Sequence, residues 1–351
     1  MFRRPIFIAA LAACVALASA APAFAMQGVG HGSGGGGGGG ASGTPGAPAA
    51  GLNFATLESL MVGDSRVLRD AVLMRLGFGG DGSGSLWAQG YGGGGRSSAS
   101  SFSGAVTSNE AGGVIAADTA FGDHWRGGLI GGYGSDRTSD PTDKASAQIR
   151  RGDAGGYAGG VYGDVHVDMV ASASWNAIRN NRLDALGDVY SARYNAVTGQ
   201  AYAEGSYVLK VGPATIAPIA GVGWAGIYQQ GFTDAPANGA ILSAENRRNI
   251  GFTDVGGRGG ATWDLGGLAV TPFIRLSWRH AFGGLASGYY GAQSGLGDTI
   301  MGAPIDRDTL AVNGGLKFNV AKAATLGLTY DGDFGARRRD QLGGARLNLP
   351  F

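Results

Sequence analysis

Apolar and polar residues alternate along the last eleven residues of the chain, which end on an aromatic side chain. One face of this stretch carries Leu347, Leu349 and Phe351, and the other carries Arg346 and Asn348. Successive side chains of a β-strand point to opposite faces, so a period of two predicts a strand with one apolar and one polar face. A wall between hydrocarbon and an aqueous lumen requires strands of this kind.

The same alternation recurs in four upstream segments, 165–176, 269–282, 309–320 and 325–334. Arg275, Arg279 and Lys317 all lie on the polar face of their segments. An Arg or Lys that faces lipid at the membrane midplane costs about 2–4 kcal/mol, so this segregation favours a membrane wall. A β-sandwich also alternates, but its strands are shorter than the roughly 10–14 residues expected here, a length that suits a tilted span.

Short turns and longer connections follow one another from Leu86 to the end of the chain. The short turns lie at 121–124, 162–164, 211–213, 264–267 and 320–323, and the longer connections at 92–105, 136–147, 177–196, 229–247, 283–306 and 335–340. Short turns on one side of a sheet and long loops on the other are typical of an outer-membrane barrel. The turns divide the region into about twelve strands, an even number as such barrels require. The fold class predicted is therefore all-β and membrane-embedded: a twelve-stranded antiparallel transmembrane β-barrel.

Aromatic residues concentrate near the ends of the expected strands. They are Trp87, Tyr91, Trp125, Tyr133, Trp175, Trp224, Trp263 and Trp278. Amphipathic rings gather at both membrane interfaces, so these residues are predicted to form aromatic girdles on the outside of the barrel.

The N-terminus has the features of an export signal. Arg3 and Arg4 precede an apolar stretch over 6–20, and Ala23 and Ala25 form a small-residue cleavage site. Residues 1–25 are therefore predicted to be a signal peptide. A competing interpretation starts from Leu11–Cys14, which resembles a lipobox and would make Cys14 a lipidated N-terminus; the two alternatives stay open. Cleavage after Ala25 would remove the only cysteine and leave no disulfide or thiol chemistry.

Two segments of different character separate the signal from the strands. Residues 26–51 are rich in Gly, Ala, Ser and Pro and are predicted to be disordered. Residues 52–77 carry apolar residues at helical spacing, with a break expected at Gly63. A helix of that length reaches roughly 35 Å, enough to thread the lumen of a barrel. Downstream of the signal there is no apolar run of about 18 residues, which excludes a helical membrane protein.

The polar faces of the strands provide candidate residues for the lumen. Those predicted to line it are Glu204, Lys210, Arg258, Arg275, Arg279, Asp331 and Asp333. We expect them to form ion pairs with the helix charges Arg66, Arg69 and Asp70. Inward glycines would smooth the lumen for a passing chain: Gly221, Gly223, Gly256, Gly260 and Gly315.

The chain shows little sign of cofactor chemistry. Its net charge is +1, from 27 basic and 26 acidic residues, which argues against a nucleic-acid partner. The four histidines, His31, His124, His166 and His280, are scattered and lack the spacing of a metal site. Asp136, Asp140 and Asp143 could bind calcium, but a solvated acidic loop is the favoured interpretation. No metal, cofactor or enzymatic activity is expected, and an outer-membrane hydrolase ranks last among the functions considered.

Several stretches resemble the C-terminal translocator of the autotransporter family of type V secretion. They include Gly63–Leu73, Leu86–Gln89, Gly112–Asp118, Ala203–Tyr207, Gly231–Thr233, Pro272–His280 and the terminal Phe351. The resemblance covers roughly residues 52–351, so 52–77 would be the linker helix and 84–351 the barrel. It implies a twelve-stranded barrel whose lumen holds the linker helix. It also implies insertion by the outer-membrane assembly machinery, which reads Leu347, Leu349 and Phe351 in the last strand.

The function implied is passage of the protein's own N-terminal segment across the outer membrane of a Gram-negative bacterium. The expected partners are membrane lipid and the assembly machinery, with the barrel a monomer. Family members normally carry a large passenger, whereas about 26 residues precede the helix here, so a vestigial passenger is expected. A second hypothesis is an adhesin-like barrel that acts through its extracellular loops.

Overall fold

The computed structural model describes residues 54–78, 83–99, 104–140, 145–183, 188–235, 241–286, 288–293, 296–321 and 324–351. All of these belong to one compact unit, Ala50–Phe351. The predicted signal peptide with Ala23 and Ala25, the lipobox alternative at Cys14, the Gly-rich segment 26–51 and Asp143 lie outside the described residues.

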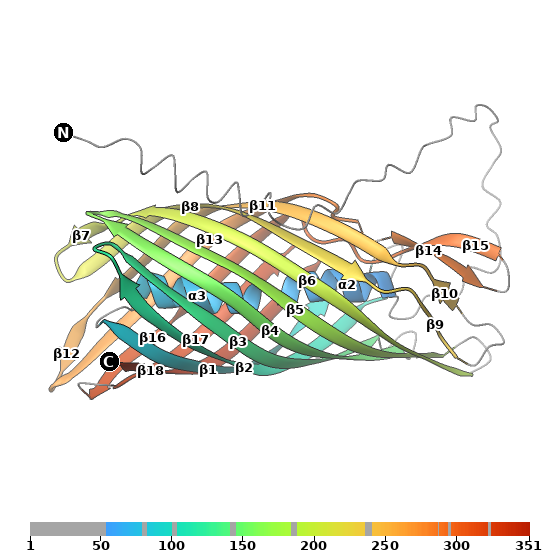
Figure 1. Ribbon diagram of the computed structural model, residues 1–351, viewed down its shortest axis with the longest axis horizontal. Helices are drawn as coiled ribbons and strands as arrows, with labels where there is room; N and C mark the ends of the chain where they lie inside the picture. Colours follow the sequence, from blue (N-terminus) through green and yellow to red (C-terminus); the bar gives the residue numbers. More distant parts are fainter. Residues whose placement is uncertain are drawn as a thin grey trace, which may run out of the picture. The chain divides into compact units, whose positions relative to one another are not determined.

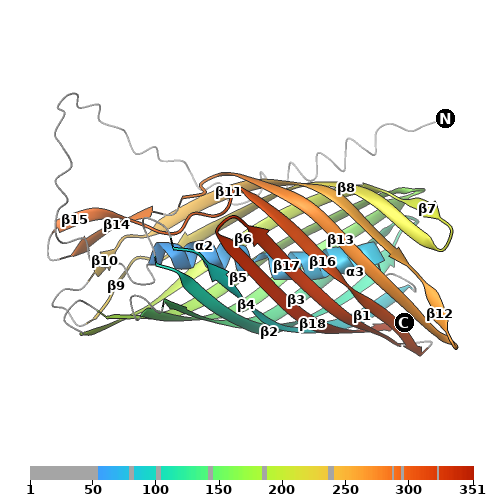
Figure 2. The same cartoon turned by 180° about the vertical axis from the view of Figure 1, so that it is seen from behind.

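Twelve long strands form a closed ring (Figures 1 and 2). They are β1 (Gly84–Ser97), β2 (Val106–Phe121), β3 (Trp125–Asp140), β4 (Ala145–Tyr162), β5 (Val165–Leu183), β6 (Val189–Tyr207), β8 (Ala214–Gln229), β11 (Asn246–Ala261), β13 (Leu268–Gly283), β16 (Asp308–Ala321), β17 (Ala324–Gly335) and β18 (Arg338–Pro350). Each pairs antiparallel with the next, and β18 returns to β1, with Leu349 opposite Leu86. Closure leaves the ring of long strands without a free edge, which a structure in lipid requires, and the predicted twelve-stranded barrel is confirmed.

Shorter strands lie at the two ends of the ring. β7 (Leu209–Val211) and β12 (Trp263–Leu265) pair with β8 and β13 next to the short turns. A separate four-stranded sheet is formed by β9 (Phe232–Thr233), β10 (Ile241–Ser243), β14 (Gly288–Gln293) and β15 (Leu296–Met301). It lies at the opposite end of the barrel (Figure 1).

The predicted turns are correct where they are described, but the strands are longer than predicted. Gly122, Gly163 and Gly212 adopt φ of 60°, 66° and 58°, the left-handed conformation that favours glycine in tight turns. The strands of the ring contain 12 to 19 residues. Most of 136–147 and 177–196, predicted as loops, is therefore strand. The strand ends on this side carry polar residues on both faces, which in sequence is the composition of a loop.

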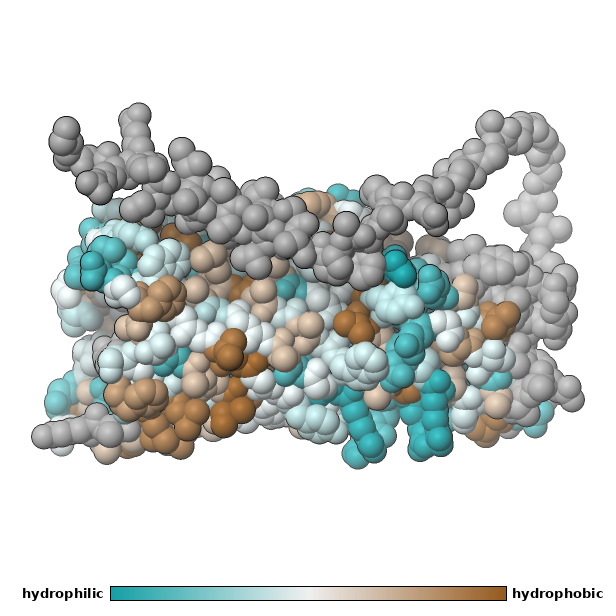
Figure 3. All heavy atoms as spheres, in the orientation of Figure 1, coloured by the Kyte–Doolittle hydropathy of each residue, from teal (hydrophilic) through white to brown (hydrophobic). Residues whose placement is uncertain are grey.

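The predicted alternation of faces is confirmed in β5, β13, β16 and β17. On β13, Ile274 and Leu276 are exposed on the outside, whereas Arg275 and Ser277 are buried inside. Leu347 and Leu349 of β18 also face outward. Hydrophobic residues gather on the wall toward the end with β12 and the C-terminus, while long hydrophilic side chains project nearer the end with β9 and β10 (Figure 3).

The aromatic prediction is correct for part of the set and wrong for two residues. Tyr133, Trp175, Trp263 and Trp278 are exposed on the outer surface, and Trp125 and Trp224 are half-buried. Trp87 and Tyr91 instead point into the lumen, with exposed fractions of 1% and 8%. Their position on the inward face of β1 lets them meet polar partners: Trp87 Nε1 donates to Tyr157 Oη at 2.8 Å, and Arg151 Nη2 donates to Tyr91 Oη at 2.9 Å.

Two helices thread the barrel, α2 (Phe54–Asp64) and α3 (Arg66–Phe78), as predicted (Figures 1 and 2). The break falls at Ser65, two residues after the predicted Gly63. Polar residues such as Glu58 and Arg69 are buried along with the apolar ones, because the wall surrounds the helices on every side. Among the described helices none is long and apolar enough to cross a bilayer.

Candidate functional site: the filled lumen

The first helix is held at the end of the barrel that carries the small sheet. Asn246 Nδ2 donates to both carboxylate oxygens of Glu58 at 2.9 Å, and Arg248 Nη1 lies 3.6 Å from Glu58 Oε2. The backbone of Ala303, in the connection before β16, forms two hydrogen bonds with α2. Its N–H donates to Thr56 Oγ1 at 3.0 Å, and its carbonyl accepts from Ser59 Oγ at 2.7 Å. These two hydrogen bonds hold the connection between β15 and β16 against α2.

The junction between the helices is held by charges on the last strands of the ring. Arg338 of β18 donates from Nη2 to Asp64 Oδ1 at 2.8 Å. Arg66 pairs with Asp331 and with Asp333, whose Oδ2 lies 3.1 Å from Arg66 Nε. The predicted pairing of Arg66 with wall carboxylates is therefore confirmed.

Near the C-terminal end of α3, one carboxylate of β2 collects several donors. Arg75 binds Asp118 through Nε to Oδ2 and Nη2 to Oδ1, both at 3.0 Å. Tyr157 Oη and Ser85 Oγ donate to the same carboxylate at 2.8 and 3.0 Å. Arg126 also forms an ion pair with Asp118. A buried carboxylate with this many donors has its charge fully compensated.

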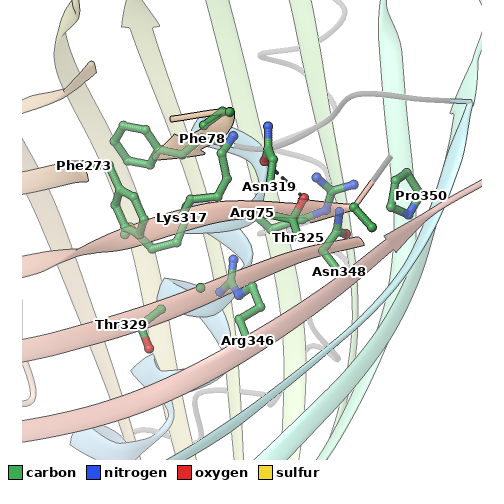
Figure 4. Close-up of a pocket in the computed structure, with 15 residues that line it drawn as sticks. Arg75, Phe78, Phe273, Lys317, Asn319, Thr325, Thr329, Arg346, Asn348 and Pro350 are labelled. Carbon is green, nitrogen blue, oxygen red and sulfur yellow. Dashed lines mark hydrogen bonds between the residues drawn. The ribbon is translucent and has the colours of Figure 1, made fainter. Parts of the chain in front are cut away.

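The C-terminus of α3 is capped by the wall at the short-turn end. Lys317 Nζ donates to the carbonyl of Phe78 at 2.9 Å, which compensates the negative end of the helix dipole. The Phe78 ring stacks on Phe273 with centroids 4.9 Å apart. A cavity of about 360 Å³ remains beside these residues, bordered also by Arg75 and Arg346 (Figure 4).

The predicted lumen residues form ion pairs that link different strands of the ring. Arg275 of β13 reaches Glu204 of β6 at 2.6 Å, although two strands of the ring lie between them. Arg258 pairs with Asp168 at 2.9 Å. Arg279 pairs with Asp254 and Asp333, each at 3.1 Å. The structure thus places Glu204, Arg258, Arg275, Arg279 and Asp331 on inward faces, where they join the ion pairs of the lumen.

Other predicted lumen residues lie elsewhere or have other partners. Lys210 is exposed in β7, a strand of three residues beside a short turn, and does not line the lumen. Asp70 pairs with its neighbour Arg69 at 2.9 Å. The Arg69 guanidinium lies 5.3 Å from the Tyr202 ring centre and 5.1 Å from that of Phe252. The helix charges are therefore satisfied partly within the helix and by aromatic faces rather than by wall carboxylates alone.

The acidic-loop interpretation is wrong for the two aspartates that are described. Asp136 and Asp140 lie on the inward face of β3 with exposed fractions of 4% and 1%. The longer strand explains the difference, since it continues through 136–140 and turns alternate residues toward the lumen. Within the described residues, no group of three or more His, Cys, Asp or Glu side chains has the geometry of a metal site.

The inward glycines do not leave an open path. A Cβ on Gly221 or Gly223 would collide with Tyr202 and, for Gly223, with Phe252 as well. A Cβ on Gly315 would meet Phe273 at 2.8 Å and backbone of β17 closer still. These glycines make room for aromatic rings and close strand packing in the filled lumen, so the predicted smooth channel is not present in this state.

Several charged residues of the lumen were not identified from the sequence. They include Glu58, Glu110, Asp118, Arg151, Asp254 and Arg338. Strand parity places Asp168 on the polar face of β5 and could have placed Asp254 too, since Asp254 alternates with the outward Val255 of β11. Asp254 pairs with Arg279 on the neighbouring strand. The partners of Glu110 and Asp168 could not have been found, because Arg151 and Arg258 lie on strands that are not paired with theirs. The arrangement as a whole holds a helical linker inside a closed ring and supplies a counter-charge along its length.

The comparisons with known proteins agree with this architecture. Residues 86–331 match the family model described as the autotransporter beta-domain. Among solved structures, the translocator domain of autotransporter NalP from Neisseria meningitidis is similar with a TM-score of 0.69 and 13% identity, over 84% of this chain and 97% of that one. The transport unit of AIDA-I from Escherichia coli is similar with a TM-score of 0.59 and 14% identity, over 84% of this chain and 97% of that one. The beta domain of the Bordetella autotransporter BrkA is similar with a TM-score of 0.59 and 20% identity, over 77% of this chain and all of that one.

Two curated relatives are each an extracellular serine protease of Serratia marcescens. One is 24% identical over 202 residues, which cover 55% of this chain and 19% of that protein. The other is 23% identical over 236 residues, 64% of this chain and 21% of that protein. The chain thus spans about a fifth of the length of these relatives. The family model, in contrast, covers well over half of the chain, and the chain belongs to the autotransporter beta-domain family.

Proposed function

We propose that β1–β18 form the translocator through which the segment preceding α2 passes to the outer face of the membrane, after which α2 and α3 fill the lumen. The observation that carries this proposal is the threading of a linker of two helices, α2 and α3, through a closed ring, with wall contacts at both ends. A linker in that position joins a segment on one side of the membrane to the first strand on the other.

The direction of threading follows from the turns. Short turns of outer-membrane barrels face the periplasm and longer loops face outside. Gly122, Gly163 and Gly212 lie in short turns. The strand register puts these turns at the end where α3 leads into β1, since Gly84 at the start of β1 lies opposite Thr119, just before the first turn. The N-terminus of α2 therefore faces outside, in contact with the connection that contains Ala303.

Transport requires that the lumen be free of the helices while the segment passes. The ion pairs of Arg66 and Arg75 with the wall can form only when α2 and α3 have taken their final places. Until then water has to solvate Asp118, Asp331 and Asp333, since a buried unpaired carboxylate is costly. Docking of the linker thus removes charges from water in pairs and favours the closed state.

We also propose that the barrel resides in the outer membrane of a Gram-negative bacterium as a monomer. Insertion there by the assembly machinery would use β18, whose Leu347, Leu349 and Phe351 project outward. The relatives that share the fold are autotransporters of such bacteria. The adhesin-like alternative is not favoured by these comparisons. The protease activity in the names of the Serratia relatives is theirs, and no catalytic role is proposed for the barrel.

The proposal is tested with an epitope inserted after Gly40, in cells that produce the protein. We expect external protease to remove the epitope from intact cells while the barrel keeps its heat-dependent shift in gel mobility. The control carries the same epitope between Gly163 and Asp164, in a short turn, and should be cut only after the outer membrane is opened. An epitope after Gly40 that stays protected in cells with a folded barrel would overturn the proposal.

A further inference from the structure

Six exposed arginines project from the outer surface of one side of the barrel. They are Arg96, Arg137, Arg150, Arg179, Arg193 and Arg339, on β1, β3, β4, β5, β6 and β18. None of them forms an ion pair with a described residue. We refer to these six residues as the arginine band.

The strand register sets members of this band directly against each other. Arg179 of β5 pairs with Arg193 of β6, and Arg96 of β1 pairs with Arg339 of β18. Arg137 lies in the same row as Arg179, separated by Gln148. Like charges directly opposite on one face of a sheet repel. Two such pairs on one surface therefore indicate that negative charge from outside the chain compensates them.

The carboxylates of the same strands do not provide that charge, because they face the other way. At the level of the arginine band, Glu110, Asp136, Asp140 and Asp340 are buried on the inward face. Lumen arginines already pair with two of these carboxylates, Arg151 with Glu110 and Arg338 with Asp340. On the opposite side of the barrel the corresponding Arg247 has its own exposed partner, with Glu245 Oε1 at 3.8 Å from Nη2.

The height of the band is defined by the aromatic residues below it. Tyr133 and Trp175 face outward in one row of the sheet, separated by Gly152. Arg150 lies two residues beyond this row, and Arg179 lies four residues beyond it. With a rise of about 3.3 Å per residue and a tilt of about 45°, the Cα atoms of Arg150 and Arg179 lie roughly 5 to 9 Å above the aromatic row. Aromatic rings mark the membrane interface, so the band lies at the level of the lipid headgroups.

We infer that the arginine band binds the phosphate groups of the phosphorylated glycolipid, lipopolysaccharide, in the outer leaflet. A guanidinium group binds phosphate through two parallel hydrogen bonds and is easier to desolvate than an ammonium. The arginine band contains no lysine, although lysine would provide the same charge. It extends from β18 to β6 and adjoins the lipid-facing wall. A ligand with several phosphates and its own acyl chains matches both the charge and the apolar surface below it.

The test uses the full folded protein in detergent, with purified lipopolysaccharide as the probe and its enzymatically dephosphorylated form as the comparison. Wild type should bind the phosphorylated form more tightly. Replacing both opposed pairs in the variant Arg96→Gln, Arg179→Gln, Arg193→Gln, Arg339→Gln should weaken that binding by about tenfold or more. The matched control is Arg247→Gln, an exposed arginine on the other side of the barrel, which should bind as wild type does. Heat-dependent gel mobility verifies that each variant is folded.

The two double variants, Arg96→Gln with Arg339→Gln and Arg179→Gln with Arg193→Gln, keep the test usable if the fourfold variant does not fold. Each is expected to lose part of the affinity. Equal binding of phosphorylated and dephosphorylated lipid by wild type would overturn the inference, as would unchanged binding by the folded variants. Binding of a soluble sulfated polysaccharide in place of the lipid, abolished by the same substitutions, would also overturn it and assign the band to an external polyanion.

Discussion

Arg75 of the linker helix and Asp118 of the barrel wall form a two-point ion pair, with both nitrogen–oxygen distances at 3.0 Å. Ser85, just after the start of β1, joins the same group, because Arg75 Nη2 and the carboxylate both contact its hydroxyl. One carboxylate therefore connects the last turn of the helix, the first strand and the second strand. This group fixes the point at which the chain leaves the lumen and enters the wall.

We expect Asp118→Asn to destabilise the barrel more than Arg75→Met. Without the carboxylate, Arg75 and Arg126 remain inside the lumen with their counter-charge removed, at a cost of about 3–5 kcal/mol. With Arg75→Met, Asp118 retains Arg126 and Tyr157, so the cost is smaller. Urea unfolding in lipid vesicles measures both, with Asp123→Asn in an exposed turn as the control. Equal stability of Asp118→Asn and this control would contradict the assigned role.

Loss of the helix charges should open the lumen without opening the ring. In the double variant Arg66→Met, Arg75→Met, α3 loses its ion pairs with Asp118, Asp331 and Asp333, and the helix can leave its place more often. We expect a higher mean conductance in planar bilayers than for wild type. Arg247→Gln, on the outer surface, should leave the conductance unchanged. A wild-type conductance in the double variant would mean that packing alone holds the helix.

A charge on the outer wall should be costly at mid-height and tolerated near the rim. Leu129 is 75% exposed on β3, midway between Trp125 and Tyr133. Leu129→Arg should reduce the free energy of unfolding by about 2–4 kcal/mol. Ser146→Arg, on an exposed position of β4 opposite Ser139 and Asn181 and nearer the rim, should cost only about 0–1 kcal/mol. Similar losses for the two variants would show that lipid does not contact this wall.

Glycines that receive an aromatic ring should be less replaceable than glycines on the lipid face. A Cβ at Gly223 would collide with the Phe252 ring, whereas a Cβ at Gly90 meets nothing within 4 Å. Gly223→Ala should therefore lower stability by about 1–3 kcal/mol. Gly90→Ala should be close to neutral. Heat-dependent unfolding of the two variants at the same temperature would contradict this explanation of Gly223.

The barrel and the direction of its faces could be predicted because each strand carries that information locally. On β5, outward Trp175 and inward Asp168 differ by an odd number of positions, and a period of two is enough to separate them. Trp87 was assigned to the wrong side because an aromatic residue near a strand end suits a membrane interface and a lumen equally well. Its neighbours Tyr157 and Arg346, which decide its position, come from strands that are far from β1 in the sequence.

The ion pairs of the lumen could be predicted as residue types but not as partners. Arg275 and Glu204 were both expected inside the barrel, yet nothing in the sequence joins two residues from strands that are not paired. Asp136 and Asp140 were missed for a different reason. They lie where β3 extends beyond the outward Tyr133, and a strand with polar residues on both faces has the composition of a loop.

Limited digestion with trypsin tests most directly whether the linker is enclosed by a closed barrel. Arg66, Arg69 and Arg75 are potential cleavage sites in α3, and their exposed fractions are 4%, 3% and 2%. Mass spectrometry of the folded protein in detergent should show all three uncut, and all three cut once boiling has unfolded the barrel. Fragments that begin at Val67, Asp70 or Leu76 while the barrel is still folded would contradict the account.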